Sequence, residues 1–136
     1  MTPGFGARWS PDGTQLVYEA PGVGGVGDLF VIGPDGSDPH PLLSTPELEQ
    51  PGGWSPDGAR ILFTRYDSAN RPSVLVMNAD GTNVRRLGPG IAAAWSPDGR
   101  RILYSAGFFT RLLVIDADGT HRHAVTRFAA SEPDWR

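Results

Sequence analysis

The sequence contains no cysteine among its 136 residues, which excludes disulfide bonds and thiolate zinc sites. It has no apolar run near the ~20 residues of a membrane-spanning helix, so we expect no membrane insertion. No window shows helical periodicity, because its 18 glycines and 13 prolines interrupt every candidate. The net charge of −3 lacks the basic footprint of a nucleic-acid-binding protein. The first residues include no apolar signal segment, so the sequence leaves the compartment unknown.

The sequence does contain an internal repeat. The pentapeptide Trp-Ser-Pro-Asp-Gly stands at Trp9–Gly13, Trp54–Gly58 and Trp95–Gly99, and a partial fourth copy ends at Trp135. A fixed period of roughly 40 residues is typical of stacked repeat architectures.

Each repeat predicts four short antiparallel strands, the first of which ends at the tryptophan. Two apolar runs follow, and because they are apolar at consecutive positions they indicate strands covered on both faces. The last run is more polar, as expected of an outer edge strand. The first apolar runs are 15–19, 60–64 and 101–105, the second are 29–32, 74–77 and 112–115, and the polar runs are 40–43, 84–87 and 123–126.

Two Asp-Gly turns punctuate each repeat. Glycine supplies the positive φ that a tight turn requires, and the aspartate side chain can accept a hydrogen bond from the backbone two residues further on. In an up-and-down meander these turns fall at one end of the sheets and the variable connections fall at the other, where binding residues concentrate. The variable connections are 20–28, 43–53, 65–73, 88–92, 106–110 and 128–133.

The pentapeptide, the aliphatic and aromatic strand after it, and turns such as Asn78–Thr82 closely resemble the WD-like repeat of TolB-type β-propellers. The resemblance implies an all-β propeller of four-stranded antiparallel blades, with one domain over residues 1–136. It is also shared with prolyl-oligopeptidase-like peptidases and polysaccharide lyases, and it implies a periplasmic or other extracytoplasmic location. The blades are predicted at about 4–44, 50–88 and 90–127, with an extra innermost strand at 130–136.

Three blades do not close a ring, because propellers contain about 4–8 blades. TolB-type propellers have six, so we expect two chains to pair as a homodimer that completes a six-bladed ring. The alternative is a longer chain that supplies the missing blades. The segment 131–135 would add an innermost strand to a next blade and would compete with 5–9 for that position.

Residues that could perform chemistry are explained as scaffold. The serines Ser10, Ser55 and Ser96 are turn residues by repetition, and no Gly-x-Ser-x-Gly nucleophile elbow is present. The aspartates occur mostly one per turn, whereas a calcium loop concentrates several. His121 and His123 share a face of a predicted edge strand but lack a third ligand. We expect no catalytic residue, metal or cofactor. Packing between adjacent blades is predicted for Trp9, Trp54, Trp95 and Trp135.

Candidate binding residues gather at the variable end. Phe108 and Phe109 form an aromatic pair where the other repeats have polar residues or glycine, which suits a partner hot spot or an extended strand. We therefore predict a non-catalytic scaffolding module that binds a protein or peptide ligand. The alternatives are the propeller portion of a larger enzyme and a self-assembling half-propeller. The other candidate binding residues are Tyr66, Asp67, Arg71, Arg111, Glu47 and Glu49.

Overall fold

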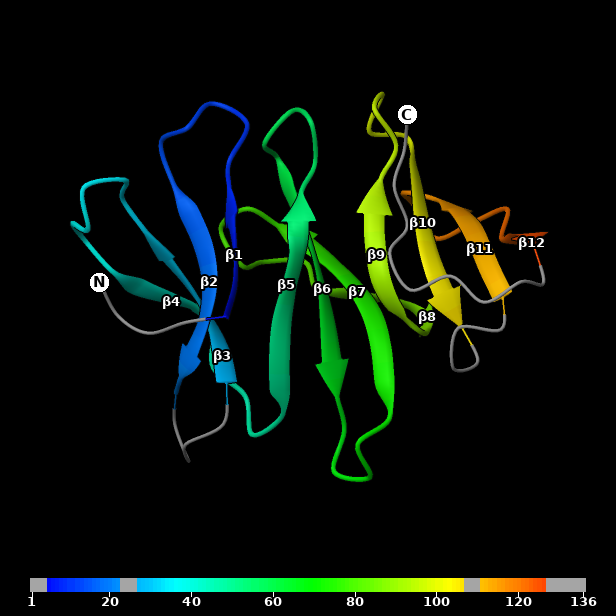
Figure 1. Ribbon diagram of the computed structural model, residues 1–136, viewed down its shortest axis with the longest axis horizontal. Helices are drawn as coiled ribbons and strands as arrows, with labels where there is room; N and C mark the ends of the chain where they lie inside the picture. The colour runs from blue at the N-terminus through cyan, green and yellow to red at the C-terminus, as the bar shows by residue number, and fades with distance from the viewer. Residues whose placement is uncertain (1–4, 23–26, 107–110, 127–136) are drawn as a thin grey trace.

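The computed structural model describes residues 5–22, 27–106 and 111–126, and these residues form three four-stranded antiparallel sheets. The all-β prediction is confirmed, and we call the sheets blades 1, 2 and 3 in chain order (Figure 1). Blade 1 contains β1 (Phe5–Trp9), β2 (Leu16–Pro21), β3 (Gly27–Ile32) and β4 (His40–Leu43). Blade 2 contains β5 (Leu48–Trp54), β6 (Arg60–Tyr66), β7 (Pro72–Asn78) and β8 (Arg85–Pro89). Blade 3 contains β9 (Ile91–Trp95), β10 (Arg101–Ala106), β11 (Arg111–Asp116) and β12 (His123–Thr126).

The blades stand side by side, and their first strands β1, β5 and β9 are neighbours (Figure 1). Each sheet is a meander in which consecutive strands pair. The six Asp-Gly turns therefore lie at one end of the blades, which we call the turn end. The β4–β5, β6–β7 and β8–β9 connections lie at the opposite end, which we call the loop end. The end of β10 and the beginning of β11 also lie there. No helix in the described residues is long and apolar enough to cross a membrane.

Two apolar clusters fill the spaces between blades, and the middle blade contributes to both. Along β6, Ile61 and Phe63 pack against blade 1, whereas Leu62 between them packs against blade 3. All three side chains are fully buried. Successive residues of a strand point to opposite faces, so a strand between two blades must be apolar at consecutive positions. This explains why the central runs lack the alternation of a half-buried strand.

The turn end is built from one hydrogen-bonded unit repeated three times. In blade 1, the Gly13 amide donates to the Ser10 carbonyl at 2.9 Å. The Ser10 hydroxyl donates to Asp12 Oδ1 at 2.7 Å, and the Thr14 amide donates to the same oxygen at 3.0 Å. The Thr14 hydroxyl also donates to Asp12 Oδ1, at 2.7 Å. This bond first, and then those from the Ser10 hydroxyl and the Thr14 amide, lower the pKa of Asp12 to about 2. Equivalent bonds recur around Ser55, Asp57 and Ala59, and around Ser96, Asp98 and Arg100.

Each internal blade junction is also tied by a tryptophan. Trp54 of blade 2 donates its indole N–H to the Arg8 carbonyl of blade 1 at 3.1 Å. Trp95 of blade 3 donates in the same way to the Gly53 carbonyl of blade 2 at 3.2 Å. A tryptophan therefore reaches the first strand of the preceding blade, at the residue just before that blade's own tryptophan.

Candidate functional site

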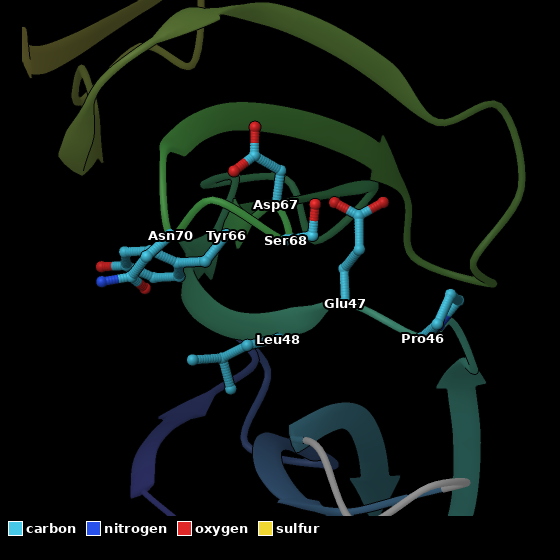
Figure 2. Close-up of a pocket in the computed structure, with 7 residues that line it drawn as sticks. All are labelled: Pro46, Glu47, Leu48, Tyr66, Asp67, Ser68 and Asn70. Atoms are coloured by element: carbon cyan, nitrogen blue, oxygen red, sulfur yellow. The ribbon is translucent and has the colours of Figure 1, made fainter.

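A pocket of about 490 Å³ lies at the loop end of blade 2. The beginning of β5 and the segment before it form one wall, and the β6–β7 connection forms the other. Figure 2 shows these two segments with their side chains around the pocket. The lining residues are Pro46, Glu47, Leu48, Tyr66, Asp67, Ser68 and Asn70. The structure thus brings together three predicted binding residues, Glu47, Tyr66 and Asp67.

The β6–β7 wall is shaped by Asp67, whose carboxylate organises its own loop. Oδ1 accepts hydrogen bonds from the amides of Ala69 and Arg71, both at 2.9 Å. Oδ2 accepts a hydrogen bond from Arg71 Nε at 2.9 Å. The backbone bond from Arg71 is the largest cause of the lowered pKa of Asp67. Asn70 completes the turn with a φ of +62°, a conformation that asparagine tolerates better than most residues.

The opposite wall is held by Thr45 and, behind it, by a buried acid. The Thr45 hydroxyl accepts from the Glu47 amide at 3.2 Å. The Thr45 amide donates to Asp28 Oδ1 at 3.3 Å, and Asp28 is 1% exposed. Asp28 belongs to β3, so this bond fastens the β4–β5 connection to blade 1. Asp28 was not among the predicted site residues, because residue 28 was assigned to the variable connection 20–28, whereas β3 begins at Gly27. A buried acid of this kind requires a polar partner.

Glu49 corrects one prediction, because it was expected in a loop and accessible to a partner. It lies in β5 opposite Arg65 of β6, and its side chain is fully buried. Arg65 donates to Glu49 Oε2 through Nε at 2.9 Å and through Nη2 at 2.7 Å. Glu49 Oε1 is buried and has no hydrogen-bond partner among the described residues. Burial raises the pKa of Glu49, and Arg65 opposes that rise.

The remaining predicted binding residues do not line this pocket. Arg71 pairs with Asp67 and is largely exposed. Arg111 begins β11 at the loop end of blade 3 and is exposed. Phe108, Phe109 and Trp135, together with the proposed extra strand at 130–136, lie outside the described residues.

In the described ranges, no group of three or more histidine, aspartate or glutamate side chains is placed to hold a metal ion. His121 is also not on the edge strand where it was predicted, because β12 begins at His123. It has a φ of +57°, and its Nδ1 lies 2.8 Å from Asp116 Oδ2. The left-handed backbone and this contact make His121 part of the β11–β12 turn. It therefore does not share a strand face with His123.

No protein-family model matches the sequence. A curated relative, the uncharacterized peptidase YuxL of Bacillus subtilis (strain 168), is 35% identical over 57 residues, which cover 42% of this chain and 9% of the peptidase. Among solved structures, TolB from Acinetobacter baumannii superimposes with a TM-score of 0.75 and 21% identity, covering 93% of this chain and 32% of TolB. The β-propeller domain of the Trilobed protease from Pyrococcus furiosus superimposes with a TM-score of 0.65 and 16% identity. This match covers 90% of this chain and 42% of the protease chain.

The chain spans less than half of the length of each of these three proteins. The structural likeness covers nearly all of the chain, so its fold is that of TolB-like β-propeller blades. This result confirms the predicted repeat architecture. At these identities the likeness defines the fold and assigns no activity.

Proposed function

We propose that these three TolB-like blades form a non-catalytic module that binds a protein or peptide ligand at the loop end. The observation that supports the proposal is the pocket between Glu47 on one wall and Tyr66 and Asp67 on the other. One wall comes from the connection between blades 1 and 2 and the other from the β6–β7 connection of blade 2, and packed strands hold both. Binding sites commonly consist of loops that a rigid scaffold positions in this way.

The chemistry of the pocket favours a ligand with a basic side chain. Glu47 and Asp67 offer carboxylates, and Tyr66 offers an aromatic ring. A lysine or arginine side chain can pair with a carboxylate while its charge lies over the ring, which stabilises it by about 0.5–2 kcal/mol. Arg71 already neutralises part of the Asp67 charge, so Glu47 is the carboxylate that we expect the ligand to use.

The proposal can be tested by selecting displayed random heptapeptides on the chain. We expect the selected peptides to be enriched in lysine or arginine. Tyr66→Ala should weaken the best peptide at least tenfold, since truncating an aromatic anchor commonly costs about 2 kcal/mol or more. Glu47→Gln should weaken binding less, because it removes charge and keeps the shape of the side chain. Fluorescence polarisation with a labelled peptide measures both effects.

A matched control lies at the turn end. Asp38 is 91% exposed and has a φ of +54°, which asparagine also tolerates. Asp38→Asn should therefore leave both folding and peptide affinity unchanged. Equal binding by the Tyr66→Ala chain and the unmodified chain, or selected peptides without basic residues, would contradict the proposal.

A second candidate function is the accessory propeller of a larger enzyme. It is favoured by the sequence match to a peptidase and the structural match to a protease propeller. On this alternative the catalytic groups belong to another part of the protein. Immunoblotting of cells that express the native gene distinguishes the two candidates. A single band near the chain mass of 14.6 kDa would exclude the alternative, and a band several times larger would favour it.

A further inference from the structure

The two internal junctions place equivalent residues in equivalent contacts, so they define what one blade offers to the next. Trp54 is 9% exposed and donates to the backbone of the preceding blade. Trp9 occupies the same position in blade 1, where the described residues provide no preceding blade, and it is 55% exposed. We call the face of blade 1 that contains Trp9 the leading face. It presents the same indole N–H donor as the internal junctions, but the described residues provide no preceding blade for it to contact.

The outer strands show the same relation on the other side. Leu42 packs into the cluster between blades 1 and 2, and Leu87 is 8% exposed in the cluster between blades 2 and 3. Val125 occupies the equivalent bulge position of β12 and is 57% exposed. We call this face of blade 3 the trailing face. Trp9 and Val125 are thus two of the three large exposed apolar residues in the described chain, and both occupy junction positions.

The turn glycines give a third, independent comparison. A Cβ atom added to the backbone of Gly58 would lie 3.8 Å from Pro11 Cδ of blade 1. A Cβ atom added to Gly99 would lie 3.3 Å from Pro56 Cδ of blade 2. A blade's first turn therefore contacts the proline of the blade before it. Gly13, at the same position in blade 1, has nothing within 4 Å. Pro97 of blade 3 is the equivalent of Pro11 and Pro56, and it is exposed.

We propose that the leading face of one chain docks on the trailing face of a second copy of the chain, and that the reverse contact closes a ring of six blades. The indole N–H of Trp9 would donate to the Ala94 carbonyl of the partner, as Trp54 donates to Arg8. Gly13 would lie on Pro97, and Val125 would be covered by the first blade of the partner. Six blades lie within the usual range of closed propellers, whereas three do not.

The apolar surfaces between these points fit the same docking. On blade 1, Leu16, Tyr18, Phe30 and Ile32 stand at the positions through which blades 2 and 3 pack on their predecessors. Leu16 and Phe30 are partly exposed and are the side chains that a partner would cover, whereas Tyr18 and Ile32 are already buried within the chain, at 6% and 7% exposed. The partner is therefore a blade of the same repeat, and this chain provides one in blade 3. The inference is independent of the loop-end pocket, which lies on blade 2.

The test is the mass of the chain in solution, measured by light scattering and sedimentation equilibrium over a hundredfold range of concentration. We expect twice the chain mass of 14.6 kDa. A monomer over the whole range would overturn the proposal. A mass that keeps rising with concentration would mean open head-to-tail chains and would overturn the closed ring.

Two substitutions test the predicted surfaces. Val125→Asp and Trp9→Ala should each weaken dimerisation at least tenfold, because each lesion is present in both contacts of the ring. Both residues are exposed within one chain, so circular dichroism should show an unchanged strand content. Val84→Asp is the matched control, since Val84 is 39% exposed but belongs to neither junction cluster. Equal weakening by all three substitutions would overturn the assignment.

A mixture of the Trp9→Ala and Val125→Asp chains tests the head-to-tail pairing. In a mixed dimer, one contact contains both lesions and the other contains neither. Where a lesion abolishes the contact that contains it, neither variant alone retains a contact, whereas the mixed pair retains one intact contact. The mixture should then dimerise at lower concentration than either variant alone. A pairing of two leading faces would leave Val125→Asp without effect, and no gain on mixing would overturn the head-to-tail arrangement.

Discussion

The turn end and the loop end of the blades use polar residues in opposite ways. At the turn end, the serine and the aspartate of each Ser-Pro-Asp-Gly turn bond to each other, and the same unit appears in all three blades. At the loop end, the polar residues differ from blade to blade, and in blade 2 they surround a pocket or pair with residues of other segments. The polar groups of the turn end bond to one another and stabilise the strands, whereas the loop end presents polar groups that a ligand can reach.

The largest loss of stability is expected from Arg65→Met at the loop end. It would leave the fully buried carboxylate of Glu49 without its partner, and breaking a buried pair in this way costs about 3–5 kcal/mol. We expect a loss of about 3 kcal/mol at pH 7, measured by urea unfolding. The double variant Glu49→Gln with Arg65→Met should recover part of that loss.

The same variant has a defined pH dependence. Burial already raises the pKa of Glu49, and removal of Arg65 would raise it further. A raised folded-state pKa contributes stability below the unfolded-state pKa, and this contribution is lost as pH rises through the folded-state pKa. The difference in stability between the variant and the unmodified chain should therefore shrink from pH 7 towards pH 4.5. A difference that stays constant with pH would contradict the assigned role of the buried carboxylate.

A smaller effect is expected at the turn end from Ser55→Ala. Ser55 is 2% exposed, its hydroxyl donates to Asp57, and it accepts from the Arg60 amide at 3.0 Å. Loss of these bonds should cost about 1–2 kcal/mol in thermal and urea unfolding. Ser96→Ala repeats the change in blade 3 and should give a similar value. Very different losses at the two sites would show that the turns are not equivalent units.

The smallest effect should come from Arg71→Gln beside the pocket. Its ion pair with Asp67 is largely exposed, and exposed pairs contribute about 0–1 kcal/mol. The free energy of unfolding should change by less than about 0.5 kcal/mol, while the affinity for basic peptides should rise because a competing cation is removed. Unchanged affinity would mean that Asp67 does not take part in ligand binding.

The blade architecture could be predicted because each signal occurs three times. The turns at Asp12, Asp57 and Asp98 depend only on residues close in sequence, so local rules are sufficient. Glu49 could not be placed because Pro51 and Gly53 suggested a loop. The strand continues through them by a change of register between Pro51 and Gly53, with Gly53 at a φ of +141°. That shift determines which residue faces Arg65, and no local pattern in the sequence encodes it.

The tryptophan that joins neighbouring blades has a consequence for how such chains evolve. Its acceptor is a main-chain carbonyl, which belongs to an arginine at one junction and to a glycine at the other. This hydrogen bond therefore does not require a particular side chain from the preceding unit. A duplicated or recombined gene segment that encodes one blade brings its own donor and finds an acceptor on any neighbour. The number of blades can thus change by duplication while side chains at the loop end diverge.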